Sequence, residues 1–370
     1  MASLLILIAL FVCAYGWLVV LPRFGAVEFW SKSPPSRKSK HYHAEKSAFV
    51  NSETAEKAIA YSKSKINYWE LIQLYFKRRK FLEPGKRLPT TQPNFDLFHG
   101  PHRGCKFIWF GHSSFLVTIE GVNILVDPVF ENFASPLDFV TRRYQSPVVS
   151  RKDLPRVDVV LISHDHYDHL EKSSVDFFSK TRALFVVPLK VGRHLRRWGV
   201  KEGRIVELDW WETYRYLNVE LTAAPAQHFS GRILPFENRT LWCSWRIKSQ
   251  SFNLFYSGDS GYGPHFKEIG EKLGPFDLTF LECGQYHKAW PEVHLLPQKF
   301  RATCEDLKTE SVVPVHWAAF TLSLHPWQEP VEKLVNLLSE SKIRYRVPLM
   351  GETVDLVKEW EENVWWRSEA

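Results

Sequence analysis

Short runs of β-branched and other apolar residues recur along the middle of this chain, separated by Gly, Pro and Asp. Runs of this length bounded by turn residues are typical of buried β-strands. We therefore predict strands at 106–110, 115–119, 122–126, 157–162, 184–187, 219–224, 243–247, 253–256, 278–281 and 313–315.

Apolar residues at helical spacing fall between and after these strands. They predict helices at 171–179, 191–198, 264–273, 297–307 and 329–340, and a further helical stretch at 53–80. We find no internal repeat and no low-complexity segment. The mixture indicates the α/β (α+β) class, with two sheets covered by outer helices.

The first residues follow another pattern, because Leu4 to Leu21 contains no charged residue. This length is near the lower limit for a helix that crosses a bilayer. No Lys or Arg precedes the apolar run, so we predict an uncleaved anchor; a cleaved signal peptide or a buried core helix is the alternative. The predicted division is 1–22 as membrane anchor or uncleaved signal, 23–99 as linker and N-terminal helical extension, and 100–360 as the catalytic domain.

Charge and cysteine content indicate on which side of the membrane the catalytic domain lies. All the nearby basic residues follow the apolar run, which favours the cytoplasmic side; a periplasmic or other non-cytoplasmic location is the alternative. These residues are Arg23, Lys32, Arg37, Lys38, Lys40 and Lys46. Five cysteines are few and odd in number, which favours a reducing compartment. The net charge of +7 and the basic run at 77–80 suit anionic headgroups or a solvated helix end. No nucleic-acid partner is expected, since no recognition module accompanies that run.

The strongest chemical signal is the hexad His164-Asp165-His166-Tyr167-Asp168-His169. It follows the predicted strand 157–162 and should form a loop in which His164 and His166 project to one side. Asp168 and His169 are expected at the start of the next helix. A single histidine is usually no ligand, but three imidazoles and a carboxylate within six residues can hold two neighbouring metal ions.

The hexad resembles the signature of the metallo-β-lactamase fold superfamily, whose remaining motif positions are matched by His228, Asp259 and His316, each after a predicted strand. The resemblance implies a four-layer αββα sandwich and two ions with a water between them. One ion would be held by His164, His166 and His228, the other by Asp168, His169 and His316, with Asp259 bridging both. Ligands without thiolate suit zinc, although iron or manganese would accept the same groups.

Longer stretches at 109–117, 127–130, 258–263 and 314–317 are similar to one branch of this superfamily, that of N-acyl-phosphatidylethanolamine-hydrolysing phospholipase D and its bacterial relatives. The similarity covers residues 100–355. It implies a zinc-dependent, phospholipase D-type phosphodiesterase that uses a metal-bridging hydroxide on a phospholipid or other hydrophobic substrate met at a membrane. The oligomeric state is left open, a homodimer included.

Four residues are the catalytic candidates: Asp259, Asp168, His112 and His294. His112 is expected to orient a ligand or contact substrate, and His294 to line the active site, although Val293 stands where the phospholipase has a polar residue. Arg232, four residues after His228, is expected either to neutralise a phosphate or to form a surface ion pair.

Two other interpretations fit the same residues. One is a different hydrolase of this superfamily, such as a lactonase, a thioesterase or a nuclease, although a nuclease would usually need an inserted domain for which this chain has little spare length. The other is a non-catalytic membrane-bound binding module on an enzyme scaffold. Such a module would be expected to lack metal ligands, and none is missing here.

Overall fold

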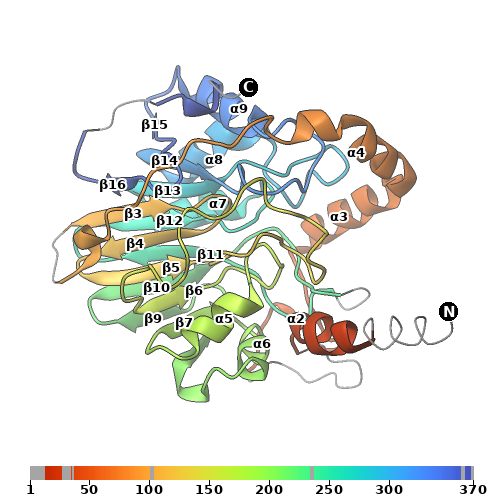
Figure 1. The fold of residues 1–370 in the computed structure, drawn as a ribbon, viewed down its shortest axis with the longest axis horizontal. Coiled ribbons are helices and arrows are strands. Elements are labelled where there is room, and N and C mark those ends of the chain that lie inside the picture. Colours follow the sequence, from red (N-terminus) through yellow and green to blue (C-terminus); the bar gives the residue numbers. More distant parts are fainter. Residues whose placement is uncertain are drawn as a thin grey trace, which may run out of the picture.

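The computed structural model describes residues 13–26, 35, 37–100, 104–233, 237–359 and 363–367. Most side chains of the basic run at 77–80 lie outside the described part. Two seven-stranded mixed sheets form the body (Figure 1). The first has the order β16 (Thr353–Asp355), β3 (Cys105–Trp109), β4 (Phe115–Ile119), β5 (Val122–Val126), β6 (Val159–Leu161), β7 (Leu184–Pro188), β8 (Ile205–Leu208). The second has the order β15 (Arg344–Tyr345), β14 (Ser311–Val315), β13 (Leu278–Glu282), β12 (Asn253–Tyr256), β11 (Ser244–Lys248), β10 (Val219–Ala224), β9 (Thr213–Tyr216).

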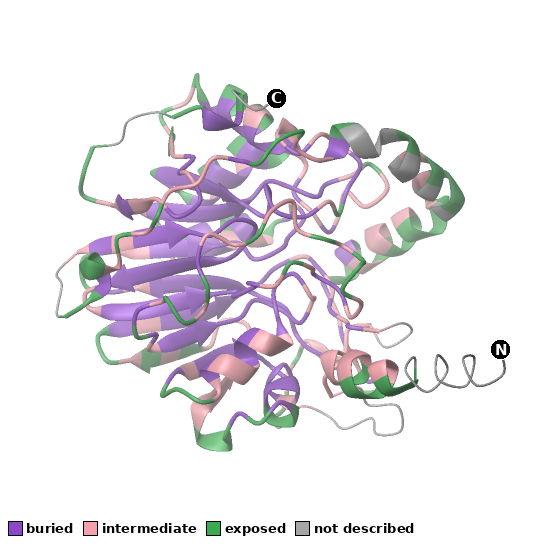
Figure 2. Cartoon of the chain, in the orientation of Figure 1, coloured by how far each residue is buried: buried purple, intermediate pink, exposed green. Residues whose placement is uncertain are grey.

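The alternation of side chains along each strand builds the layers. In β3, Phe107 points toward the second sheet, and its ring meets that of Phe280 edge-on at 5.1 Å. Its neighbour Ile108 points the other way, into a separate cluster with Val175 and Leu195 of the outer helices. The two sheets therefore face each other across the main core, and their strands are largely buried (Figure 2).

Helices cover the sheets. α5 (Lys172–Phe178) and α6 (Gly192–Arg197) lie on the first sheet. α7 (His265–Lys272), α8 (Phe300–Leu307) and α9 (Glu329–Leu338) cover the second sheet, and they add Phe266, Phe300 and Leu334 to its core. This α/β sandwich is the architecture that the sequence led us to expect.

Most predicted elements form, and the differences lie at sheet edges and in the extension. β8 and β9 were not predicted, because they are edge strands of only four residues whose side chains are mostly not fully buried. The helix predicted at 53–80 is two helices, α3 (Glu53–Lys65) and α4 (Tyr68–Leu82). The break occurs at Asn67, whose side chain accepts a hydrogen bond from Glu70 N and caps α4.

The N-terminal extension packs against the body. β1 (Tyr42–His43) and β2 (Ala48–Phe49) form a hairpin from which Phe49 is buried against Leu189 and Trp242. α3 and α4 follow and lie beside the loops at one end of the two sheets (Figure 1). The extension is thus placed where those loops carry the predicted ligands.

Only part of the predicted anchor is described, since residues 1–12 lie outside that part. The remainder is helical, with a π-helical turn η1 (Gly16–Val20) followed by α2 (Leu21–Arg23). Trp17 is 73% exposed and Leu18 is 70% exposed. Among the helices that the structure describes, none is both long enough and apolar enough to span a bilayer.

Candidate metal centre

The hexad forms a tight turn between β6 and α5. The backbone amides of His169 and Leu170 both donate to the carbonyl of His166, at 3.1 and 2.8 Å. Helix α5 begins only at Lys172, so the expectation that Asp168 and His169 start that helix was wrong. The turn places side chains of the hexad in two neighbouring clusters.

The first cluster consists of His164, His166, His228 and Asp259. Nδ1 of His166 lies 2.9 Å from Nε2 of His164 and 3.3 Å from Nε2 of His228. The ring nitrogens of these three histidines therefore converge on one point, although His228 follows β10 in the other sheet.

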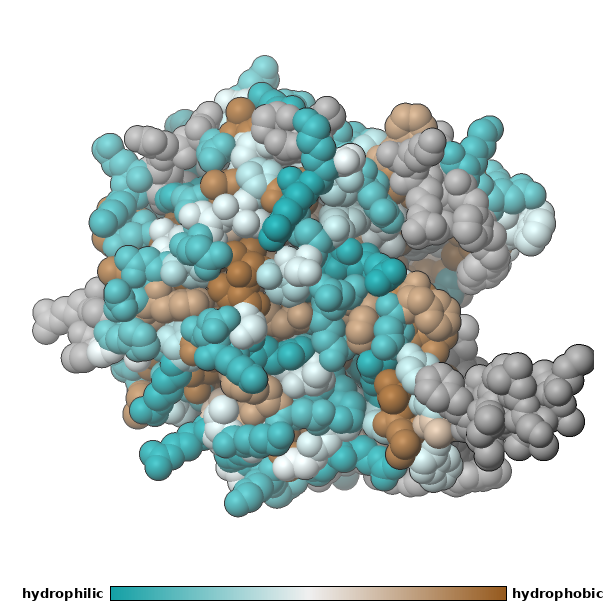
Figure 3. Space-filling model, in the orientation of Figure 1, coloured by the Kyte–Doolittle hydropathy of each residue, from teal (hydrophilic) through white to brown (hydrophobic). Residues whose placement is uncertain are grey.

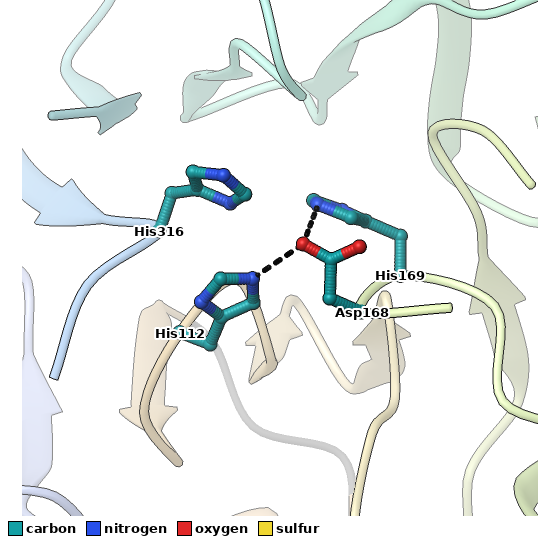
Figure 4. A group of neighbouring side chains, drawn as sticks. All are labelled: His112, Asp168, His169 and His316. Atoms are coloured by element: carbon teal, nitrogen blue, oxygen red, sulfur yellow. Dashed lines mark hydrogen bonds and ion pairs between the residues drawn. The ribbon is translucent and has the colours of Figure 1, made fainter. Parts of the chain in front are cut away.

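The second cluster consists of His112, Asp168, His169 and His316 (Figure 4). Oδ2 of Asp168 lies 2.9 Å from Nε2 of His112 and 3.4 Å from Nε2 of His169. The backbones of His112 and His316 are held together, because His316 N donates to His112 O at 2.9 Å. His112 is fully buried, and its ring contacts the Asp168 carboxylate and lies against the rings of His316 and Phe320.

Asp259 lies between the clusters. Its Oδ2 is 3.8 Å from His164 Nε2 and 3.7 Å from His228 Nε2. Its Oδ1 is 3.3 Å from His169 Nε2 and 3.2 Å from His316 Nδ1. One carboxylate oxygen thus faces each cluster, which is the arrangement that the resemblance implied for a bridging ligand.

Several buried atoms in this centre lack a hydrogen-bond partner among the described residues: His112 Nδ1, His169 Nε2, His316 Nε2 and Asp259 Oδ1. Buried polar atoms nearly always have a hydrogen-bond partner. These unpaired nitrogen and oxygen atoms come from several loops and require a further group, such as a metal ion, among them. Burial holds the pKa of His164, His228 and His316 well below the usual range, which keeps these imidazoles neutral and able to bind a cation. The two clusters therefore fit a dinuclear metal site.

A second layer of residues orients the ligands. The carboxylate of Asp127 accepts hydrogen bonds from His169 Nδ1 at 2.7 Å and from the hydroxyl of Tyr256 at 2.6 Å. Nδ1 of His228 donates to Val293 O at 2.7 Å. Such partners fix which ring nitrogen faces a metal. Asp127 lies in the motif at 127–130, but no role was predicted for it from the sequence.

Glu282 and His294 form a buried pair beside the centre. His294 Nδ1 lies 2.9 Å from Glu282 Oε2, and Oε1 of Glu282 accepts hydrogen bonds from Ser260 N and Leu295 N. Burial raises the pKa of Glu282 to about 7. Burial lowers the pKa of His294, but the carboxylates of Glu282, Asp259 and Asp168 together outweigh it and the net shift is upward. Glu282 was not predicted from the sequence, although, like Asp259, it lies at the carboxyl end of a buried strand.

A cavity of about 350 Å³ opens above both clusters. Its floor includes His166, Asp168, Asp259, His294 and His316. Its walls are mainly apolar, and one of them is α3 of the extension, through Ile59, Lys63 and the following Ile66. The remaining wall residues include Phe229, Trp290, Val293 and Leu322. No sequence pattern indicates that α3 forms a wall of this cavity, because α3 reaches it only in the folded chain.

Arg232 does not match either expectation for it. The side chain is buried, and its guanidinium donates to three backbone carbonyls, those of Arg23, Asp165 and Leu170. It does not line the cavity above the clusters. The prediction of a phosphate ligand or a surface ion pair was therefore wrong, and the residue has a structural position behind the metal-binding loop.

Comparisons with known proteins agree with this geometry. Residues 122–317 match the family model of the beta-lactamase superfamily domain. An uncharacterized protein of Mycobacterium tuberculosis is 40% identical over 86% of each chain. N-acyl-phosphatidylethanolamine-hydrolyzing phospholipase D 1 of Caenorhabditis elegans is 30% identical over 75% of this chain and 81% of its own. The structure of Igni18, a metallo hydrolase from the archaeon Ignicoccus hospitalis, aligns with a TM-score of 0.53 at 22% identity, over 70% of this chain and 99% of its own.

Proposed function

This chain belongs to the beta-lactamase superfamily, in the branch related to N-acyl-phosphatidylethanolamine-hydrolysing phospholipase D, and is a phospholipase D-like, metal-dependent hydrolase; we propose that it is a zinc enzyme that cleaves N-acyl-phosphatidylethanolamine-like lipids. The observation that carries this proposal is the combination of two ligand clusters with an apolar-walled cavity directly above them. A phosphodiester on the cavity floor and acyl chains along its walls would satisfy both features.

The ligand assignment follows from the clusters. His164, His166 and His228 would hold one ion, Asp168, His169 and His316 the other, and Asp259 would contribute one oxygen to each. Two bound ions would supply Lewis acidity to a phosphoryl group and lower the pKa of water. We propose zinc because the set has five imidazoles, two carboxylates and no thiolate; iron and manganese are the alternatives that metal analysis would distinguish.

Residues of this chain supply the proton transfer and hold the ligands in position. In the proposed reaction, the oxygen of a water bonds to phosphorus, and the bond from phosphorus to the ethanolamine oxygen breaks. One water proton stays on the phosphatidic acid, and a proton must reach the departing oxygen. His294 lines the cavity with Nδ1 bonded to Glu282, so its Nε2 is the atom placed to give that proton. His112 holds Asp168 in place through Nε2.

We also propose that the enzyme works at a membrane surface, with its catalytic domain on the cytoplasmic side. The face in Figure 3 is mostly hydrophilic, with hydrophobic residues scattered over it, as is usual for a surface in water. Trp17 and Leu18 of the N-terminal helix and Trp69 of α4 are large and more than two-thirds exposed. Side chains of this kind insert into the boundary between headgroups and acyl chains.

The test is hydrolysis by the purified full chain after loading with Zn²⁺, Fe²⁺ or Mn²⁺. Substrates are vesicles of N-acyl-phosphatidylethanolamine, phosphatidylethanolamine or phosphatidylcholine, and a soluble phosphodiester, a lactone and a thioester. Release of phosphatidic acid from the first substrate, with two metal ions per chain, is the expected result. Cleavage of only the lactone or the thioester would overturn the lipid assignment and leave the metal assignment intact.

A further inference from the structure

Behind the metal-binding loop, one buried guanidinium connects two segments that are far apart in sequence. Nη1 of Arg232 donates to Asp165 O at 2.7 Å and to Leu170 O at 2.8 Å. Nε and Nη2 donate to Arg23 O at 3.1 and 2.7 Å. The two acceptors on one side lie within or directly after the hexad, and the acceptor on the other side ends helix α2.

Aromatic rings keep this guanidinium in place. It lies 3.9 Å from the ring centre of Tyr167, inside the hexad, and 5.2 Å from that of Trp198. The hydroxyl of Tyr167 also donates to Arg232 O at 2.8 Å. A planar, forked donor is needed here, because a lysine has one ammonium and cannot reach acceptors on opposite sides.

A second connection runs in parallel through His194. Ala26 N donates to His194 Nδ1 at 3.0 Å, so the proton on that ring must be on Nε2, which lies 3.1 Å from Asp165 Oδ2. The other oxygen of Asp165 accepts a hydrogen bond from Gly231 N. The indole of Trp198 adds a bond to Pro22 O at 2.7 Å. Three backbone groups, Pro22 O, Arg23 O and Ala26 N, therefore make the link.

Elsewhere the N-terminal helix and the loop are separated. A cavity of about 210 Å³ lies between them, lined by Leu18 and Pro22 on one side and by Tyr167 and Glu171 on the other. The hydrogen bonds at residues 22, 23 and 26 therefore carry much of the connection between the N-terminal helix and the hexad. A displacement of that helix would act on the metal-binding loop through Arg232 and His194.

We propose that Arg232 is a positioning residue that couples the end of the N-terminal helix, at residues 22–26, to the metal-binding loop, so that the metal site is fully formed only while this segment is docked. The proposal rests on the assignment of the hexad as the metal-binding loop and is independent of the lipid substrate. Partners in the layer around metal ligands typically change metal affinity 10- to 100-fold when they are removed.

The test measures zinc affinity and backbone amide exchange in the full-length chain. Arg232→Met should weaken zinc binding roughly 10- to 100-fold, Arg232→Lys should fall between it and wild type, and both should speed amide exchange at 164–170. Arg239→Met is the matched control, because Arg239 donates to Lys46 O and Ser47 O of the extension and not to the hexad. It should keep zinc affinity within about twofold of wild type.

Trp198→Phe is the milder variant, for use if Arg232→Met does not fold. It removes the indole N–H that binds Pro22 O and shortens the ring that lies beside Arg232 and His194, so it should speed amide exchange at both 22–26 and 164–170. Wild-type zinc affinity in folded Arg232→Met, or unchanged exchange at 164–170 in Trp198→Phe, would overturn the proposal. Equal losses in Arg239→Met would also overturn it, since they would reflect general loosening of the extension. A wild-type protein that binds no metal would instead refute the metal assignment under the proposed function.

Discussion

The loops at the ends of the two sheets and the N-terminal extension meet at one cavity, but they are built differently. The ligand side chains on the loops are mostly buried, and partners fix several of them, such as Asp127 behind His169 and Val293 O behind His228. Helix α3 of the extension is mostly exposed (Figure 2), and the extension gives the cavity wall Ile59 and Ile66 beside the polar Ser62 and Lys63. This difference indicates that the loops determine the chemistry and the extension determines which molecule reaches it.

The largest effect should come from the bridging carboxylate. Asp259→Asn removes a negative charge that faces four imidazoles, so we expect loss of at least one metal ion and a fall in kcat of roughly 1,000-fold or more. Metal content by mass spectrometry and phosphatidic acid release measure the two effects. Asp176→Asn, on the exposed side of α5, is the control and should behave as wild type. Full activity in Asp259→Asn would refute the proposed site.

The next prediction concerns Asp127, which orients a metal ligand and is not itself a ligand. Asp127→Asn keeps a hydrogen-bond acceptor for His169 but removes the charge, so metal affinity should fall roughly 10- to 100-fold while the fold is retained. Zinc titration against a chelator measures the change. The matched control is Asp158→Asn, a carboxylate that accepts a bond from Asn123 N at the far end of β6. An equal loss in both variants would mean that general destabilisation, and not support of the ligand, is responsible.

The sequence revealed the loops much better than the extension. Each ligand after the hexad follows a largely buried strand, and strands such as 219–224 and 253–256 appear where the apolar runs predicted them. The same criterion, a carboxylate at the end of a buried strand, would also have identified Asp127 and Glu282 as candidates. Edge strands were missed because their residues are only half-buried, and the cavity wall made by α3 depends on contacts with residues more than 100 positions away. Arg232 was misjudged because its acceptors are backbone carbonyls, which carry no mark in the sequence.

A smaller effect should appear when the extension is changed. Ile59→Ala shortens an apolar side chain in the cavity wall, which removes about 1–2 kcal/mol of contact with a bound acyl chain, or roughly 5- to 30-fold in KM. Zinc content and kcat should stay at wild-type values. Tyr61→Ala, on the exposed side of the same helix, is the matched control and should leave KM unchanged. A change in metal content in Ile59→Ala would contradict the inference that α3 affects substrate binding and leaves the metal site unchanged.

The smallest effect concerns the one ion pair that joins α3 to the rim of the cavity among the described residues. Lys63 Nζ lies 2.8 Å from Glu237 Oε2, and both side chains line the cavity and are more than one-third exposed. Pairs with this exposure contribute less than about 1 kcal/mol to stability, so neither partner's removal should shift the melting temperature by more than a few degrees.

The two substitutions should change substrate binding in opposite directions. Glu237→Gln frees the ammonium for an anionic phosphodiester and should lower KM about two- to threefold, whereas Lys63→Met should raise it by a similar factor. Both changes should shrink as salt rises, because these charges are screened by solvent. Equal, salt-independent changes in both variants would show that the pair holds α3 in place and does not act on the substrate's charge.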